Sequence, residues 1–510
     1  MKTKFILIRP PRYYWPFINE YDNFILPQSL ACLAAVLRRA GISVKVIDCM
    51  PMKMGWKTLG KVIRDENPDI IGIGDSESLY SHEAVKALNL AKEINKDIIT
   101  VAGGAHFSNL AEDCLKNYPI DFIVRGEGEE TIVELASKII NRDKDFEMVN
   151  GIVFKRDGHI VETAPRRLID NLDDLPLPAY DIMPMDKYGR AKFLFTPGGI
   201  TIHHSRGCVN SCDFCVWWVQ MAERSADHGK LVLKPRWRTK SVKRTIEEIE
   251  LLHNKYHQKF LIFVDDSWNI NPDWSNEFAE SIIKKKIKVK WFAFMRADLM
   301  VRDDKLGIMK KLVKAGLSHV SIGAERADNG DLSNMGKNFY KTEIVREAMG
   351  ILSGKYPQVF RQATFIVGVR NETKESMLSQ LEYARELKAD YPAFHPITPV
   401  PGTKLWDEAN KKGWLEVKDF SYYDWSTPVM ASEHLSRSEI DYLLYFMNKK
   451  YASFTWLLKG IFNPYTHKRN MYIWCLIVAV KMFLDSVFNL INPFRFKEYN
   501  RLMKPKWYDK

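Results

Sequence analysis

Cysteine is scarce in this chain, with 7 residues among 510. So few thiols do not make a disulfide framework for a protein of this length, and we expect a reducing compartment. Long apolar runs are missing as well. Residues 471–480 carry no charge, but Lys481 ends the run well short of the about 20 residues that cross a bilayer. The apolar part of the N-terminus, FILI, is too short for a signal peptide. These absences favour a cytoplasmic protein.

The chain also lacks a long basic run, although Lys and Arg outnumber Asp and Glu by 75 to 63. An excess of this size could favour an anionic partner. Because the basic residues are dispersed, a solvated surface explains most of them, and we expect no nucleic-acid partner. Hydrophobic content of 46% and charged content of 27% are those of an ordinary globular protein. The length predicts two to four domains.

Residues 1–145 alternate between short apolar runs and helical patterns. Continuous apolar strands joined by helices predict a parallel sheet that is covered on both faces. The first helix has Pro27 at its start and Gly41 just past its end, as helix termini prefer. The expected strands are 5–8, 43–47, 69–73, 98–102 and 121–124, and the expected helices lie near 27–40, 56–66, 81–94, 108–117 and 129–140.

Small and polar residues follow these strands, at the carboxyl ends where such sheets bind ligands. Glycine at these positions lets a ligand approach the backbone closely. Taken alone, the pattern indicates some nucleotide-like ligand, and a purely structural role for the histidine among them stays open. The residues are Ser76, Ser78, Gly103, Gly104, His106, Gly126, Glu127 and Gly128.

Three of the cysteines lie together: Cys208, Cys212 and Cys215 have the spacing C-x3-C-x2-C. A short loop of this kind can wrap three thiolates around one [4Fe–4S] cluster and leaves one iron without a protein ligand. That iron can chelate the amino and carboxylate groups of S-adenosylmethionine (SAM). The alternative is zinc, which takes four ligands, usually as two separated pairs. His203 and His204 are the nearby candidates for a fourth ligand.

Strand–helix units resume over residues 196–405. The expected strands are 199–204, 259–264, 289–294, 318–323, 362–368 and 393–398. Six parallel strands predict a partial (β/α)6 barrel that resembles a TIM barrel, with its site at the carboxyl ends of the strands. The cysteine loop follows the first of these strands, where a cofactor is expected.

The cysteine motif, VDD at 264–266, RAD at 296–298, GAE at 323–325 and PVPGT at 399–403 resemble, in this order, the radical SAM enzymes. The resemblance implies that the three cysteines bind the cluster. It implies that Asp265 or Asp266 accepts hydrogen bonds from the SAM ammonium, and that Arg296 pairs with the SAM carboxylate. By the same resemblance Glu325 binds the ribose hydroxyls and Gly368 admits the adenine. The chain has VRNET at 369–373 where the family usually has FPGET.

The first 145 residues resemble the cobalamin-binding domain that precedes the core of many radical SAM enzymes. The resemblance rests on LPQSLACLAAVLRRAGISVKVID, PDIIGIG, VAGGAH and VRGEGEETIVEL, in that order. It implies that the serines, glycines, His106 and Glu127 named above line the corrinoid. The D-x-H-x-x-G motif of another cobalamin family is absent, since Cys-Met-Pro follows Asp48. We therefore expect no histidine from this loop on the cobalt.

Together these patterns predict an α/β protein in four parts. A Rossmann-like (flavodoxin-like) cobalamin-binding domain covers 1–145, and a hairpin with a linker covers 146–195. The radical SAM barrel covers 196–405, and a mainly helical region covers 406–510.

The resemblance implies an enzyme that cleaves SAM to a 5′-deoxyadenosyl radical, uses cobalamin, and methylates an unactivated carbon of a small-molecule or lipid substrate. An external one-electron donor of the flavodoxin or ferredoxin type is implied as its partner. A radical cyclization without methyl transfer is the main alternative, because the anaerobic magnesium-protoporphyrin ester cyclase shares this domain order. A non-catalytic iron–sulfur or corrinoid electron carrier is the alternative of another class. Methylthiolation is less favoured, because Cys32, Cys49 and Cys114 sit in the cobalamin-like pattern.

The C-terminal region has an apolar, aromatic stretch with basic ends over about residues 455–500. Two interpretations stay open. A helix here can pack on the barrel and close its substrate side, which we favour, or it can lie on a membrane surface as a peripheral contact.

Overall fold

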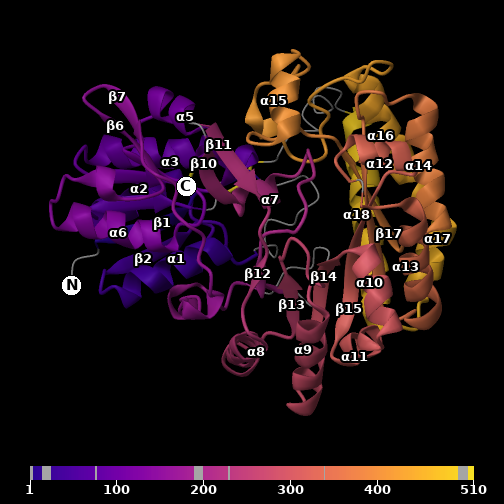
Figure 1. Cartoon of the computed structure of the whole chain (residues 1–510). Helices are drawn as coiled ribbons and strands as arrows, with labels where there is room; N and C mark the ends of the chain where they lie inside the picture. Colours follow the sequence, from indigo (N-terminus) through magenta and orange to yellow (C-terminus); the bar gives the residue numbers. More distant parts are fainter. Residues whose placement is uncertain are drawn as a thin grey trace.

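The computed structural model describes residues 4–13, 25–74, 77–188, 199–227, 230–337, 339–491 and 504–510. Two α/β bodies stand side by side, and a helical C-terminal region flanks the second (Figure 1). The predicted fold class is confirmed.

The first body is built on a 7-stranded sheet with the order β2-β1-β3-β4-β5-β6-β7. Its first five strands are parallel, and the order 2-1-3-4-5 is the flavodoxin-like one. All five predicted strands are present. The strands are β1 (Phe5–Arg9), β2 (Val44–Asp48), β3 (Ile70–Ile73), β4 (Ile99–Ala102), β5 (Phe122–Val124), β6 (Ile152–Arg156) and β7 (His159–Glu162).

Helices cover both faces of this sheet. One face packs against α1 and α6, and the other packs against α2, α3 and α5. The first helix buries Leu30, Ala34 and Leu37, as its apolar spacing predicts. The helices are α1 (Gln28–Arg39), α2 (Trp56–Glu66), α3 (Ser81–Ile94), α4 (Ala105–Asn109), α5 (Ala111–Asn117) and α6 (Glu129–Ile140).

The predicted hairpin turns at Asp157 and Gly158, whose φ angles of 50° and 81° suit a two-residue hairpin turn. Its strands β6 and β7 do not stand apart as a linker. Strand β6 pairs antiparallel with β5 and so extends the first sheet. The connection to the second body then runs through short 3-10 turns at Leu172–Asp174 and Tyr180–Ile182.

The second body is built on a 6-stranded sheet with the order β17-β16-β15-β14-β13-β8, all parallel. These are the six predicted strands of the partial barrel. They are β8 (Ile200–Ile202), β13 (Phe260–Phe263), β14 (Lys290–Met295), β15 (Leu317–Glu325), β16 (Phe360–Val367) and β17 (Tyr391–Pro396). Two short ladders lie beside the sheet: β9 (Ser205–Arg206) with β12 (Arg238–Thr239), and β10 (Glu223–Asp227) with β11 (Lys230–Lys234).

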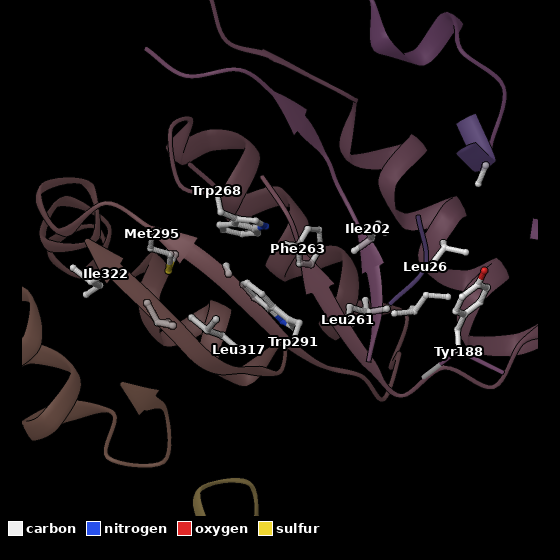
Figure 2. Packing of buried hydrophobic residues seen from close by; sticks show 14 of the residues in the cluster. Leu26, Tyr188, Ile202, Leu261, Phe263, Trp268, Trp291, Met295, Leu317 and Ile322 are labelled. Atoms are coloured by element: carbon white, nitrogen blue, oxygen red, sulfur yellow. The ribbon is translucent and has the colours of Figure 1, made fainter. Parts of the chain in front are cut away.

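Aromatic side chains pack the outer face of the barrel strands against the surrounding helices. Figure 2 shows Phe263, Trp268 and Trp291 gathered over the strands, and all three are fully buried. The same cluster continues through Leu26 and Tyr188 into the first body, so one apolar core joins the two sheets. The helices around the barrel are α7 (Val216–Gln220), α8 (Val242–Glu250), α9 (Pro272–Lys284), α10 (Ala297–Lys305), α11 (Ile308–Lys314), α12 (Asn329–Asn334), α13 (Thr342–Lys355) and α14 (Lys374–Glu386).

The C-terminal region contains α15 (Lys404–Lys411), α16 (Arg437–Tyr451), α17 (Phe454–Ile461) and α18 (Thr466–Ile491). Its long last helix begins against the barrel: Lys468 pairs with Asp390 at 2.7 Å, and the rings of His467 and Phe260 stack at 5.4 Å. Phe260 opens β13, so α18 packs at the amino ends of the strands. The first turns of α18 therefore lie away from the substrate side, which the packing interpretation expected this helix to close. Within the described residues, no helix is long and apolar enough to span a membrane.

Residues 504–510 return to the first body, where the C label stands in Figure 1. The backbone N–H groups of Trp56 and Thr58, in the first turn of α2, donate to the carbonyl oxygens of Tyr508 and Lys510 at 3.0 and 3.2 Å. This tail therefore satisfies the free donors at the start of a helix in the opposite end of the chain.

Candidate cofactor site

The cysteine loop begins at a backbone position that only glycine can take. Gly207 has φ +80°, and a Cβ atom there would lie 2.0 Å from the carbonyl oxygen of Arg236, across the β9–β12 ladder. The loop is then held from outside: the N–H of Asp213 donates to Met335 O at 3.2 Å, and its carboxylate accepts from Lys404 Nζ at 2.8 Å. These contacts fix the loop on top of the barrel.

The three thiols lie half-buried on this loop. Burial raises the pKa of each, to about 11 for Cys212 and about 12 for Cys215. Thiols with a raised pKa keep their protons at neutral pH, so iron must displace these protons when it binds. Nearby cations oppose the effect of burial: Lys337 and Arg296 lower the pKa of Cys212. Three thiols on one loop beside cationic groups fit the donor set of a thiolate-bound cluster.

Neither histidine beside the cysteine loop is placed as a fourth zinc ligand. His204 is fully buried, stacks on Trp274 at 3.8 Å, and its two ring nitrogens lie 3.0 Å from Thr239 Oγ1 and 3.1 Å from Trp268 O. His203 is buried beside Arg206. In the described part of the chain, no group of three or more His, Cys, Asp or Glu side chains is arranged to hold one metal ion.

The two neighbouring aspartates at the end of β13 face different surroundings. The Asp265 carboxylate is buried and accepts from the N–H and Oγ of Ser205, both at 2.5 Å, and from the N–H of His204 at 3.1 Å. It therefore fixes the turn before the cysteine loop. Asp266 instead lines a cavity beside the loop. Burial raises the pKa of both groups to about 7, and the Asp265 carboxylate adds to the shift at Asp266.

Two charged pairs lie near the thiols. Arg296 donates to Asp298 through Nε and Nη2, at 3.0 and 2.6 Å, and its guanidinium lies 4.8 Å from the ring of Phe339. Glu325, in the left-handed region at φ +59°, pairs with Lys337 at 2.7 Å. Lys337 was missed by the sequence analysis, because it stands in a loop with no strand end or motif to mark it.

Gly368 does not join this group. Its N–H donates to Glu372 Oε2 at 2.9 Å, and a Cβ atom at this position would meet Ile440 of α16 at 3.2 Å. The residue thus faces the outer helix. Ion pairs of Glu372 with Arg326, at 2.6 Å and 2.9 Å, brace the same corner of the barrel.

A cavity of about 300 Å³ lies between the carboxyl ends of the two sheets. Its wall on the first body consists largely of glycine backbone, and its wall on the second body is the start of the cysteine loop, α7 and the end of β13. The first wall includes Gly74, Gly103, Gly104, Gly126, Glu127 and Gly128, and the second includes His203, Ser205, Arg206, Gly207, Trp217, Val264 and Asp266. A glycine wall opposite the cluster loop fits a broad, flat cofactor such as a corrin.

Two of the residues predicted for cobalamin lie away from this cavity. His106 is buried with its Nδ1 3.1 Å from Ser78 Oγ, and its ring packs edge-on against Phe420 at 4.8 Å. Burial lowers its pKa to about 4, so the ring is neutral at physiological pH. Both residues act here in packing between the first body and the C-terminal region. Ser76 lies outside the described residues.

Glu127 borders the cavity but is already engaged. Its carboxylate pairs with Arg206 at 2.9 Å and with Arg238 at 2.8 Å, and it accepts from the N–H of Ile169 at 2.9 Å. The two arginines hold the pKa of Glu127 below its usual value despite burial. No sequence pattern indicated these partners, which come from a segment about 80 to 110 positions away.

Comparison with known proteins agrees with this geometry. Residues 14–136 match the family model of the B12 binding domain, and residues 202–384 match the radical SAM superfamily. An uncharacterized methyltransferase of Pyrococcus horikoshii is 32% identical over 86% of this chain and 90% of its own length. The anaerobic magnesium-protoporphyrin IX monomethyl ester cyclase of Rubrivivax gelatinosus is 30% identical over 91% of this chain and 79% of its own.

Among solved structures, the radical SAM methyltransferase TsrM from Kitasatospora setae, with cobalamin and a [4Fe–4S] cluster bound, shares the fold. It has a TM-score of 0.69 and 15% identity, covering 94% of this chain and 100% of that one. The assignment rests on the two family models, which match one after the other along the chain, and on relatives that align over most of its length. The chain belongs to the cobalamin-dependent radical SAM enzymes, whose cofactors are a [4Fe–4S] cluster, SAM and cobalamin.

Proposed function

We propose that this enzyme methylates a carbon atom of a small-molecule substrate. The observation that carries the proposal is the cavity between the two bodies: the glycine wall of the B12-binding domain faces Gly207, at the start of the cysteine loop, and α7 across it. When bound, the cofactors supply a carbon-centred radical and a transferable methyl group. A relative at 32% identity is named a methyltransferase, which supports the same reaction.

The residues of the site divide into holding and bracing roles. Cys208, Cys212 and Cys215 hold the cluster. Asp266, which lines the cavity, is the acceptor for the SAM ammonium. Arg296 is the partner for the SAM carboxylate.

The predicted role of Glu325 toward the ribose hydroxyls rests on its position beside the thiols, where Lys337 holds it. Gly103, Gly104, Gly126 and Gly128 form the corrin wall. We assign bracing roles to Asp265, Glu127 and Gly368 from their contacts. The reductant that the family requires is an external donor of the flavodoxin or ferredoxin type, and Val209, 48% exposed between two cluster cysteines, marks where it approaches.

Cyclization without methyl transfer is the second candidate, because the magnesium-protoporphyrin ester cyclase of Rubrivivax gelatinosus is 30% identical to this chain over 91% of its residues. The co-products distinguish the two. The reconstituted enzyme is reduced under anaerobic conditions with SAM and a small-molecule extract of the cells that express it. Methylation predicts S-adenosylhomocysteine and 5′-deoxyadenosine in similar amounts and a product heavier by one methyl group. Formation of 5′-deoxyadenosine alone, with no methylated product, would favour cyclization and overturn the proposal.

We also propose that the enzyme is cytoplasmic and touches a membrane surface through α17 and α18. Phe454, Leu458 and Phe462 follow one face of α17, and the two phenylalanines are 74% and 80% exposed. Ile477 and Val480 add exposed apolar surface on α18. Lys449, Lys450 and Lys459 stand on the neighbouring turns. Exposed aromatics next to lysines suit the headgroup region of a bilayer, and a lipid substrate would reach the enzyme there.

The contact is tested by flotation with vesicles that contain anionic lipid. The double variant Phe454→Ser with Phe462→Ser is expected to stay at the bottom of the gradient while the parent floats. Tyr118→Ser, an exposed aromatic of the first body, is the matched control and is expected to float. Equal flotation of parent and double variant would refute the contact.

A further inference from the structure

A second, smaller pocket lies behind the glycine wall of the cofactor cavity. It shares Gly126 and Glu127 with that cavity, and its enclosed volume of about 10 Å³ is that of about one water molecule, so a larger group would lie at its mouth, beside the exposed Arg167. Four arginines line it: Arg125, Arg166, Arg167 and Arg224. Nothing in the proposed reaction uses these side chains.

The carboxylates near the pocket do not pair with all four of these arginines. Arg125 pairs with Glu162, and Arg166 pairs with Glu130 and Glu134. The Glu127 carboxylate is taken by Arg206 and Arg238. Within the described part of the chain, neither Arg224 nor the exposed Arg167 has a carboxylate partner. The pocket therefore carries positive charge that the surrounding residues do not balance.

Arg224 is the most unusual member of the group. It donates to two backbone carbonyls, Gln220 O at 3.2 Å and Val219 O at 3.1 Å, while burial and the charge of Arg125 lower its pKa to about 10. Its Nε–H is buried and, among the described residues, meets no acceptor, and the same is true of the Nε–H of Arg125. Buried donors are normally satisfied, so two of them at one pocket indicate a missing acceptor.

Gly126 makes room for this arrangement. It has φ +71°, and a Cβ atom at this position would lie 3.0 Å from Arg224 Nη1. The glycine thus lets the guanidinium rest against the backbone of the loop whose other side faces the cofactor cavity. An anion bound in the pocket would lie directly behind that loop.

We propose that Arg125, Arg167 and Arg224 form an anion site that takes a phosphate group. Guanidinium groups bind phosphate oxygens by paired, charge-assisted hydrogen bonds, which supplies the acceptors that the two Nε–H groups lack. The phosphate can belong to the nucleotide tail of cobalamin or be free in solution. The site depends on the B12-binding domain and not on methyl transfer, so it stands whichever reaction the enzyme catalyses.

The experiment uses the full chain with its iron–sulfur cluster in place and the variants Arg224→Gln and Arg167→Gln. Three probes are titrated: cobalamin, cobinamide (the corrin without its nucleotide tail) and inorganic phosphate on the cobalamin-loaded protein. Arg64→Gln, an exposed arginine of α2, is the matched control. Because Arg167 is exposed, its variant is expected to fold even where Arg224→Gln does not.

If the tail phosphate is the ligand, Arg224→Gln lowers the affinity for cobalamin about tenfold or more, and Arg167→Gln lowers it about threefold. Cobinamide, which lacks the phosphate, then binds the parent and all variants with the same affinity. If free phosphate is the ligand, it raises the melting temperature of the parent and of Arg64→Gln but not of Arg224→Gln. Parent-like binding of all three probes by both pocket variants would overturn the proposal, as would an equal loss of cobalamin and cobinamide affinity with no phosphate effect.

Discussion

Arg206 and Glu127 form an ion pair at 2.9 Å, with side chains only 9% and 3% exposed. Arg206 stands two positions before the first cluster cysteine, and Glu127 stands in the glycine loop that borders the corrin cavity. One buried contact thus joins the loop assigned to cobalamin with the loop assigned to the cluster. Glu129 and Arg238 extend it into a network, at 2.5 and 2.8 Å.

Removing the Glu127 charge is expected to destabilise the fold strongly. Glu127→Gln leaves Arg206 and Arg238 with less negative charge in a buried place, and breaking a buried pair costs about 3–5 kcal/mol. Denaturant unfolding of the protein measures the change. Glu112→Gln removes a carboxylate whose pair with Lys116 is exposed, and little change in the unfolding midpoint is expected. Equal midpoints for the two variants would contradict the bracing role.

The backbone of the cysteine loop depends on Gly207. Gly207→Ala combines a positive φ with a Cβ atom 2.0 Å from a carbonyl oxygen, so we expect it to lose cluster assembly or to fold poorly. Gly307→Ala shares the positive φ, at +72°, but meets nothing within 4 Å. That control is expected to cost only about 1–2 kcal/mol. Iron content after reconstitution compares them, and a full complement of iron in Gly207→Ala would be inconsistent with the structure.

The strands could be predicted from the sequence, but the directions of individual side chains could not. The apolar runs 260–263 and 70–73 have few ways to be buried, so both sheets could be predicted with their strand ends. A strand end places a residue near the site without fixing where its side chain points. Asp265 and Asp266 are neighbours, yet one turns into the barrel and the other into the cavity.

Partners from distant segments were also beyond prediction. Arg238 reaches Glu127 across 111 positions, and Lys337 reaches Glu325 from a loop without periodicity. Gly368 faces Ile440 of α16, which belongs to the C-terminal region, and no motif in the sequence connects that region with the barrel.

Each cluster cysteine is expected to be necessary. Cys208→Ala, Cys212→Ala and Cys215→Ala each remove one of three ligands, so anaerobic reconstitution is expected to yield little iron and no cluster absorption. Cys475→Ala, on α18, is the control and is expected to reach the iron content of the parent. An unchanged cluster spectrum in any of the three ligand variants would refute that ligand assignment.

Stability is expected to fall with acidification, in part through His106. Burial lowers its pKa to about 4 from the ordinary 6.5, so the unfolded chain binds the proton first as pH falls. The contribution of neutral His106 to the unfolding free energy is fully present above pH 6.5 and is lost as the pH falls from about 6.5 to 4. At pH 5 the loss amounts to about 2 kcal/mol. His106→Phe keeps a ring against Phe420 and should flatten the dependence of the unfolding free energy on pH in this window. The exposed His159→Gln should follow the parent, and a parent-like slope in His106→Phe would contradict the burial effect.

Cobalamin and the cluster are proposed to meet at one cavity, and electron paramagnetic resonance tests this most directly. The spectrum of cob(II)alamin is recorded in the reconstituted enzyme with the cluster oxidised and then reduced. Two paramagnets on opposite walls of one cavity are expected to couple, so the cobalt signal should broaden or split when the cluster is reduced. A cobalt spectrum that is identical in both states, with both cofactors bound at full occupancy, would contradict the shared cavity.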